Sequence, residues 1–299
     1  MSLGGKKYLD ESSLRTVRKK QSRTGMIWKQ YKKNRLSMFS LYLFLFLVLV
    51  AAAADMIAPY DATQQIVKDR FMAPCMQHFF GTDSMGRDIF SRVIYGARVS
   101  IIIGFVSTSV SVVIGIVLGS LAGFYGGKTD NVIMRVLDVF MAIPNMLMAI
   151  VLAATLGPGM INCMLAVGIT GIPGMARITR ASVMTQRNQE YIESAYSNNA
   201  NDGRIIFKYI LPNALSPIFV AVASSIANSI TVAASLSFIG LGIQPPNPEW
   251  GAMLSAGREY ITKYPWLCIF PGIAILLTVF SLNNIGDGLR DALDPRLKN

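Results

Sequence analysis

The sequence predicts an all-α protein that crosses a membrane about six times. Its 299 residues have a mean hydropathy of +0.43 and only 15% of them are charged, a composition too apolar for an ordinary soluble domain. The apolar residues gather in runs of about twenty, the length that a helix needs to cross roughly 30 Å of hydrocarbon. A strongly basic segment precedes the first of these runs, as is typical of a cytoplasmic amino terminus.

Residues 1–36 form that basic segment. Eleven Lys and Arg residues stand there against only Asp10 and Glu11, in a chain of formal net charge +11. A basic segment beside a membrane span has anionic lipid headgroups as its natural partner. We therefore expect residues 1–36 to lie in the cytoplasm against membrane lipid, and we expect no nucleic acid as a partner.

The second predicted unit, residues 37–98, begins with the apolar run 37–57. This run is longer than the apolar part of a secretory signal and follows a much longer leading segment, so it predicts a retained membrane helix. Residues 58–98 then form an outer segment. Within it, Asp83 or Ser84 is expected to cap a helix that lies along the membrane surface before the second span.

This predicted surface helix has an apolar and a polar side. Its apolar positions recur at helical spacing and are Met85, Ile89, Phe90, Val93, Ile94 and Ala97. On the polar side, Asp88 and Arg92 are expected to pair at i,i+4.

Residues 99–299 form the third unit, a core with five further apolar runs. The predicted spans cover 99–123, 132–155, 160–178, 214–240 and 267–286. In the first of these, Gly115, Gly119 and Gly123 predict a face for close helix packing, with a solute-lining face as the alternative. The run 160–178 holds Pro173 among several glycines, which neighbouring helices can accommodate in a membrane.

Alternation of the spans places the connecting segments. The outside segments are 58–98, 156–159 and 241–266. The inside segments are 124–131, 179–213 and the carboxyl-terminal tail, which carries Arg290, Arg296 and Lys298. The chain is thus predicted to be a multi-pass protein of the cell (inner) membrane with both termini in the cytoplasm.

The sequence contains no convincing catalytic constellation. Residues 126–129 (GGKT) look like the end of a phosphate-binding loop, but Ala122 stands where that loop needs a glycine. A single histidine, His78, and the lack of GxSxG and HExxH patterns argue against a hydrolytic centre. Acidic residues near span ends are interpreted as ion pairs, with Asp138 expected to pair with Arg135. We therefore predict that the chain is not an enzyme and binds no cofactor or metal.

The three cysteines are interpreted as small apolar or surface thiols. Cys75, Cys163 and Cys268 show no metal-ligand spacing. Cys75 and Cys268 fall on the same predicted side of the membrane, so a bridge between them stays open.

The most informative hydrophilic segment is the inside loop at about 180–213. A polar helix containing Glu193 and Ala195 leads into a turn rich in Asn, Asp and Gly. A second short helix follows, and Pro212 is expected to end it or to redirect the chain into the next span.

This loop resembles the EAA loop of ABC importer permeases, whose pattern is Glu-Ala-Ala, three residues, Gly, nine residues, Ile, one residue, Leu-Pro. The positions that match are Glu193, Ala195, Leu211 and Pro212. The positions that depart are Ser194, Asn199 and Tyr209. Asn can adopt a left-handed turn conformation as Gly does, so Asn199 is compatible with the turn.

Segments along nearly the whole chain resemble one branch of that family, the C-type permease subunits of dipeptide, oligopeptide and nickel importers. They are Trp28–Leu36 (WKQYKKNRL), Ala58–Asp61 (APYD), Phe80–Arg98 (FGTDSMGRDIFSRVIYGAR), the positions Arg135, Asp138, Ala142 and Pro144, Gln244–Gly257 (QPPNPEWGAMLSAG), and Gly286–Arg296 (GDGLRDALDPR). The resemblance implies the type I ABC importer permease fold.

The same resemblance implies a permease subunit that forms half of a translocation pathway and hydrolyses no ATP itself. The implied partners are a homologous B-type permease, two cytoplasmic ATPase subunits that bind ATP and Mg, and an extracellular solute-binding protein. Di- or oligopeptides are the expected solute, with nickel or another small solute as the alternative. A self-sufficient secondary transporter is the alternative from another class, but it usually carries an internal repeat of spans, and none is evident here.

Two groups of site residues follow from the resemblance. The ATPase-coupling residues are Glu193, Ser194, Ala195, Asn199, Ala200, Asp202, Leu211 and Pro212. The outside segments 58–98 and 244–266 are the candidates for contact with the binding protein, with packing against the partner permease as their alternative role. Within them, the candidates for such a contact or for a gate are Asp83, Arg87, Asp88 and Trp250. In the coupling loop, Ser194 and Ala195 are small enough for close approach, and Pro212 stiffens the junction with the next span.

Overall fold

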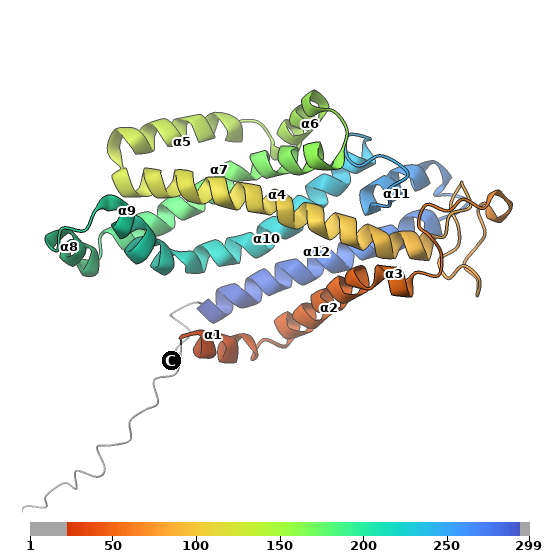
Figure 1. The fold of residues 1–299 in the computed structure, drawn as a ribbon, viewed down its shortest axis with the longest axis horizontal. Helices are drawn as coiled ribbons and strands as arrows, with labels where there is room; N and C mark the ends of the chain where they lie inside the picture. The colour runs from red at the N-terminus through yellow and green to blue at the C-terminus, as the bar shows by residue number, and fades with distance from the viewer. Residues whose placement is uncertain (1–22, 294–299) are drawn as a thin grey trace, which may run out of the picture.

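The computed structural model describes residues 23–293, which fold almost entirely into helices (Figure 1). The α-helices are α1 (Arg23–Tyr31), α2 (Arg35–Ala52), α3 (Ala54–Ile57), α4 (Ile89–Tyr125), α5 (Gly127–Met141), α6 (Asn145–Leu156), α7 (Met160–Arg187), α8 (Glu190–Ser197), α9 (Asp202–Arg204), α10 (Leu211–Phe238), α11 (Trp250–Gly257) and α12 (Trp266–Leu293). Within this described range, extended pairing is limited to a single bridge between Thr82 and Asp88. The all-α prediction is confirmed.

The predicted number of spans agrees with the structure. Five stretches are long and apolar enough to cross a membrane: α2, α4, α7, α12, and α10 together with the turns that lead into it. The helices α5 and α6 pass the same test only as a pair, bent by 86°. Counting that pair as one span makes six.

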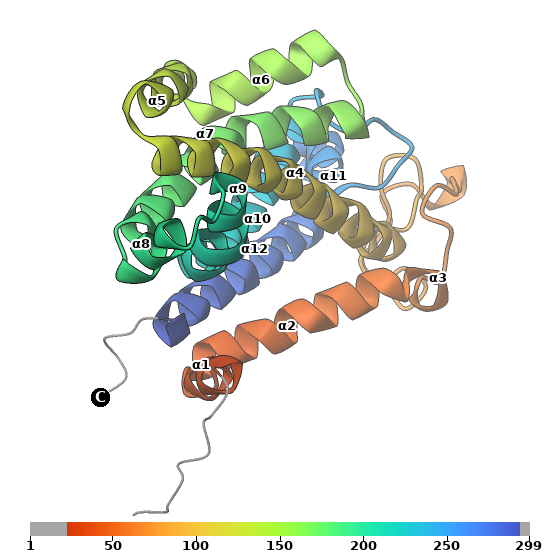
Figure 2. The ribbon, with the colours of Figure 1, turned by 60° about the vertical axis from the view of Figure 1, so that its left-hand side comes forward.

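The long helices run side by side along one axis, which leaves two distinct ends (Figures 1 and 2). One end, named here the α8 end, holds α8, α9, the start of α1 and the end of α12. The opposite end, named here the α11 end, holds residues 58–88 and α11. The segments predicted to lie on one side of the membrane therefore gather at one end of the molecule.

The glycine stripe of α4 is a packing face, as predicted. A Cβ atom on Gly115 would lie 2.7 Å from the Met175 Cβ, and one on Gly123 would lie 2.8 Å from the Arg180 carbonyl oxygen. These distances are too short for any side chain, so glycine allows α4 and α7 to pack backbone against backbone. The alternative of a solute-lining face is wrong, because α7 covers the stripe.

The helix predicted to begin after Asp83 or Ser84 begins instead after Asp88. The Asp88 carboxylate accepts a hydrogen bond from the Ser91 N–H at 2.7 Å and so caps α4. From there α4 runs without a break to Tyr125. Asp83 caps only a tight turn, where it accepts from the N–H groups of the second and fourth residues after it. No separate surface helix therefore precedes the second span.

The predicted straight span 132–155 is also wrong, because it breaks between α5 and α6. Pro144 has no N–H to donate, and it disfavours a helical conformation at Ile143. The expected pair of Asp138 with Arg135 does not form. Asp138 instead accepts a hydrogen bond from Arg177 at 2.7 Å, because α5 lies along α7 and brings that longer-range partner into reach.

The predicted break at Pro212 does not occur. Ile205–Ile210 form a π-helix that leads directly into α10, and Asp202–Phe238 together make one long helix. Pro212 lies in the first turn of α10, where a missing N–H is tolerated. The Asn213 side chain donates to the Tyr209 carbonyl at 2.8 Å. The loop after α8 is thereby joined rigidly to a membrane span.

Candidate functional site

The short helix α8 is anchored to the bundle by its inward face. That face carries Ile192 and Ala195, which are 1% and 7% exposed. Both pack into one apolar cluster whose other buried members come from α4, α7, the π-helix and α10: Phe124, Val183, Ile205, Ile206, Ile210 and Ala214. Because interiors are close-packed, a displacement of α8 must act on the ends of these three spanning helices.

The opposite side of α8 is open. Its exposed residues, named here the outward α8 face, are Glu190, Tyr191, Glu193, Ser194, Tyr196 and Ser197. On the π-helix that adjoins α8, Phe207 is 72% exposed. Exposed aromatic side chains beside polar ones are typical of a protein contact surface.

The turn after α8 closes as a Schellman motif. Asn199 adopts a left-handed conformation with φ 55°, the conformation that makes Asn compatible with a position where the family pattern has glycine. Its N–H donates to the Tyr196 carbonyl at 2.9 Å, and the Ala200 N–H donates to the Ala195 carbonyl at 3.1 Å. The Asn201 side chain then accepts from the Arg204 N–H at 2.9 Å and caps α9. Asn199 thus supports the backbone conformation for which the family pattern has glycine.

The structure divides the predicted coupling residues into two sets. Those that are exposed are Glu193, Ser194, Asn199, Asp202 and Pro212. Those that are buried or half-buried are Ala195, Ala200 and Leu211. Ala195 therefore packs closely against other residues of this chain, whereas the side chains of Glu193 and Ser194 face outward.

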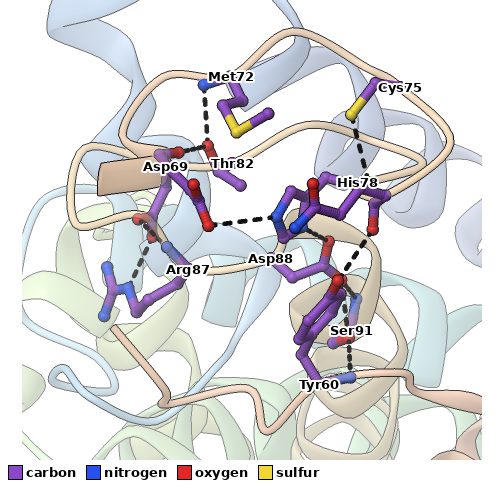
Figure 3. A network of polar contacts seen from close by, with 11 residues as sticks. Tyr60, Asp69, Met72, Cys75, His78, Thr82, Arg87, Asp88 and Ser91 are labelled. Atoms are coloured by element: carbon purple, nitrogen blue, oxygen red, sulfur yellow. Dashed lines mark hydrogen bonds and ion pairs between the residues drawn. The ribbon is translucent and has the colours of Figure 1, made fainter. Parts of the chain in front are cut away.

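The α11 end contains a polar network that sequence reasoning missed, centred on His78 (Figure 3). His78 is 1% exposed, and its Nδ1 atom donates to Asp88 Oδ1 at 2.9 Å. The other Asp88 oxygen accepts from the N–H and the hydroxyl of Ser91, each at 2.7 Å. The Tyr60 ring stacks on the imidazole at 4.9 Å. A lone histidine ten residues from its partner carries no motif, so only the fold reveals this pair.

Two arginines of this end, Arg87 and Arg92, also have partners within the chain. Arg87 pairs with Asp83 at 2.7 Å, and the Arg92 guanidinium donates to the Ala62 carbonyl at 2.7 Å. The expected pair of Arg92 with Asp88 is therefore wrong. The reason is that Asp88 is the cap of α4, which turns its carboxylate toward Ser91 and away from the helix side.

Trp250 and Glu249 fix α11 onto α4. Trp250 is 1% exposed and its Nε1 donates to the Val93 carbonyl at 2.9 Å. Glu249 is equally buried and caps α11 by accepting from the N–H groups of Gly251 and Ala252 at 2.9 and 2.8 Å. Burial raises the pKa of Glu249, against the opposing effect of these hydrogen bonds.

These contacts correct the predicted outer contact surface. Arg87, Asp88 and Trp250 are buried and Asp83 is nearly so, hence none of them presents a free surface to a binding protein. The large apolar side chains that do face outward at this end include Val67, Met76, Phe79 and Met85.

The cysteines and acidic groups form no cross-link or metal site in the part of the chain that the structure describes. Cys75, Cys163 and Cys268 are all free thiols, so the open question of a bridge between Cys75 and Cys268 is answered. Across residues 23–293, no group of three His, Cys, Asp or Glu side chains is arranged to hold a metal ion.

Five membrane-length helices and a bent pair that can form a sixth span define the chain as a multi-pass membrane protein. The family model described as binding-protein-dependent transport system inner membrane component matches residues 115–299. A second model, the N-terminal TM domain of oligopeptide transport permease C, matches residues 22–74. The chain belongs to this family of inner membrane components, and it is a non-catalytic, multi-pass permease subunit of an ABC importer.

Its similarity to characterised relatives extends over nearly the whole chain. The dipeptide transport system permease protein DppC of Alkalihalophilus pseudofirmus is 42% identical over 91% of this chain and 90% of its own length. The di/tripeptide permease DppC of Pseudomonas aeruginosa is 42% identical over 91% of this chain and 92% of its own. The glutathione transport system permease protein GsiD of Pectobacterium atrosepticum is 44% identical over 96% of this chain and 97% of its own length.

Among solved structures, the fold is similar to that of the MetNI methionine ABC transporter in an inward-facing conformation. The TM-score is 0.58 at 17% identity, and the match covers 69% of this chain and 98% of the other. An amino acid ABC transporter matches with a TM-score of 0.51 at 15% identity, and the match covers 67% of this chain and 92% of the other. These likenesses confirm the predicted permease fold.

Proposed function

We propose that this chain forms half of the translocation pathway of an importer for di- or oligopeptides. Three relatives more than 40% identical along nearly their whole length are named for dipeptide, di/tripeptide and glutathione transport. Glutathione is itself a tripeptide, so short peptides are the solute class that the three names share. Nickel, the alternative from the sequence, has no such support in these names, and the family assignment argues against a self-sufficient secondary transporter.

The partners follow from this role. The chain pairs with a homologous B-type permease in the cell (inner) membrane, with both termini and the α8 end in the cytoplasm. Two ATPase subunits, which bind ATP and Mg, sit against the α8 end. A solute-binding protein docks at the α11 end, where Val67, Met76 and Phe79 supply exposed apolar contacts. The basic residues 1–36, most of which lie outside the described residues, are placed against anionic lipid.

The single observation that carries the proposal is the two-sided character of α8. Its inward face is locked to the ends of α4, α7 and α10, whereas its outward face is exposed. A helix of this kind can receive a movement from another protein and pass it to the spans. ATP binding and hydrolysis in the partners would then shift the pathway between two states that differ in their affinity for ATP.

The test uses the assembled importer in proteoliposomes with its binding protein. Glu193→Trp adds bulk to the outward α8 face, and we expect dipeptide uptake to fall at least tenfold while ATPase subunits bind more weakly or hydrolyse ATP without transport. Glu259→Trp makes the same exchange at an exposed position of the α11 end and should leave ATPase binding unchanged. Wild-type uptake by an assembled Glu193→Trp complex would contradict the coupling role.

A further inference from the structure

Three cavities lie in a row along α7 and α10. The first, of about 340 Å³, opens at the break between α5 and α6. The second, of about 370 Å³, lies between α7 and α10 toward the α8 end. The third, of about 500 Å³, shares Pro217 with it and reaches Asp287 and Arg290 near the end of α12. Ile178 borders all three cavities. They therefore form one furrow, named here the α7–α10 furrow, which runs from the helix break to the α8 end.

The furrow has a polar wall. On α10, the exposed polar residues that border these cavities recur at steps of eleven and four, which keep them on one face: Asn213, Ser224 and Asn228. Asn228 and Thr170 border the cavity at the helix break. Asn228 lies ten residues before Phe238, the end of α10, which is about 15 Å along the helix and about half of the hydrocarbon thickness.

This wall is unsuited to lipid. An amide or hydroxyl that faces hydrocarbon without a partner costs several kcal/mol, so an exposed Asn at mid-membrane depth indicates water or a polar solute beside it. By contrast, the exposed side chains of α4 at a similar depth are Ile102, Phe105 and Val106 together with Ser109, whose hydroxyl is satisfied within its own helix by the Phe105 carbonyl. The depths correspond because the Thr108 and Ser229 hydroxyls lie 3.0 Å apart. One face of the bundle is therefore suited to solute and another to lipid.

The mouth of the furrow at the α8 end carries both signs of charge. Asp287 and Arg290 are exposed and border the largest of the three cavities. A short peptide is a zwitterion with an ammonium group, a carboxylate and intervening amides. Carboxylate and guanidinium groups can attract its two ends, and Asn, Ser and Thr side chains can exchange hydrogen bonds with its amides.

We propose that the α7–α10 furrow is this subunit's wall of the solute pathway, that it takes short zwitterionic peptides, and that Ile178 is its constriction. Its substrate class rests on the proposed function. Both helices that border the furrow are directly connected to α8. Only two residues join α7 to α8, and α10 continues the helix that begins after the turn that follows α8. A movement that the ATPase subunits impose on α8 would therefore reach the furrow, where it would shift α7, which carries Ile178, relative to α10.

Cysteine accessibility tests the water-filled wall. In the assembled importer, with the native Cys75, Cys163 and Cys268 replaced by Ser or Ala, single cysteines are placed by Ser224→Cys, Asn228→Cys and, as the depth-matched control, Val106→Cys. A charged, membrane-impermeant methanethiosulfonate should modify the two furrow cysteines at least tenfold faster than the control. Equally slow modification at all three positions would overturn the proposal, because it would mean that another subunit or lipid covers the stripe.

Solute protection and obstruction test the rest. A dipeptide present during ATP turnover should slow the modification of Asn228→Cys at least threefold, and Ile178→Trp should lower uptake at least tenfold whereas Ile178→Met should not. A lack of slowing in a complex that takes up dipeptide, or full uptake by Ile178→Trp, would overturn the assignment. If the furrow cysteines react but the importer takes up no peptide, only the proposed substrate class is contradicted. If the importer takes up dipeptide but the furrow cysteines do not react, only the assignment of the furrow to the solute pathway is contradicted.

Discussion

The two ends of the molecule treat their polar and apolar groups in opposite ways. At the α11 end, buried polar side chains find partners inside the chain, as His78 does with Asp88 and Arg87 with Asp83, both within 3 Å. At the α8 end, the outward α8 face and Phe207 stay exposed. Both ends have a buried apolar cluster beneath them, so the difference lies in what covers the surface.

This contrast teaches which polar groups already have their partners within the chain. A buried ion pair is stable only while both partners and their hydrogen bonds are present, so the α11 end has a fixed shape that a binding protein meets ready-made. The α8 end has a fixed inner anchor and an outer surface whose aromatic groups gain burial only in an assembly. Substitutions in the buried polar network of the α11 end should therefore change folding, whereas substitutions on the outward α8 face should change assembly.

The largest effect is expected at Asp88. Asp88→Ala removes the cap of α4 and leaves His78 buried without its partner, which should lower the free energy of unfolding by about 3–5 kcal/mol. The thermal unfolding midpoint of the purified complex measures this loss. Asp61→Ala makes the same exchange at an exposed site of the same segment and should change the midpoint little. Equal shifts for the two variants would mean that the His78 network does not stabilise the α11 end.

The next effect separates the two faces of α8. Ala195→Leu overpacks the buried cluster and should lower the free energy of unfolding by about 1–3 kcal/mol. It should also weaken the coupling of ATP hydrolysis to peptide transport. Glu193→Leu places the same side chain on the outward face, so uptake should fall with no loss of stability. Thermal unfolding and the ratio of ATP hydrolysed to peptide transported are measured together. Matching losses of stability in both variants would remove the distinction between an inner anchor and an outer contact surface.

A smaller effect is expected at the turn after α8. Alanine has a Cβ atom but no polar group that can hydrogen-bond locally, so it is strained at the φ of 55° that Asn199 adopts. Asn199→Ala should therefore lower the free energy of unfolding by about 1 kcal/mol, whereas Asn199→Gly should be tolerated. Coupled uptake should follow the same order. If the Ala and Gly variants behaved alike, the left-handed conformation would have no part in holding α8.

The smallest effect concerns pH at the α11 end. Burial raises the pKa of Glu249, so the folded chain binds this proton more tightly than the unfolded chain does. Stability should therefore fall as pH rises above the ordinary Glu pKa of about 4.3. Glu249→Gln cannot ionise and should flatten that fall, whereas Glu259→Gln at an exposed site should keep the wild-type slope. Parallel curves of unfolding midpoint against pH for Glu249→Gln and wild type would contradict this account.

Much of the membrane topology could be predicted from local composition, because each span needs about twenty apolar residues whatever it packs against. The glycine stripe of α4 and the left-handed Asn199 were likewise predictable, since both depend on one residue type at one position. Two prolines show the limit of this reasoning. Pro173 lies inside an unbroken α7, whereas the chain bends by 86° at Pro144. Pro173 is buried and α7 packs along α4, whereas α5 and α6 have fewer neighbours to hold them straight.

The candidate sites divide in the same way. The resemblance to permeases predicted a coupling loop at about 180–213, but it could not show that Ala195 faces inward while Ser194 faces outward. It also assigned Asp88 and Trp250 to a contact surface, although the fold buries both. Burial depends on elements far away in the sequence, such as Val93 against Trp250, and no local pattern encodes that contact.

By itself, the sequence determined the class of protein, the approximate number of spans and the position of the hydrophilic loop before α10, because these depend on the hydrophobicity and residue types of short segments. Only the tertiary structure decided where the helices break, which charged groups pair and which face of α10 stays polar and open. Such features arise from packing between segments that are distant in the chain, where the cost of burying an unpaired polar group selects one partner among several.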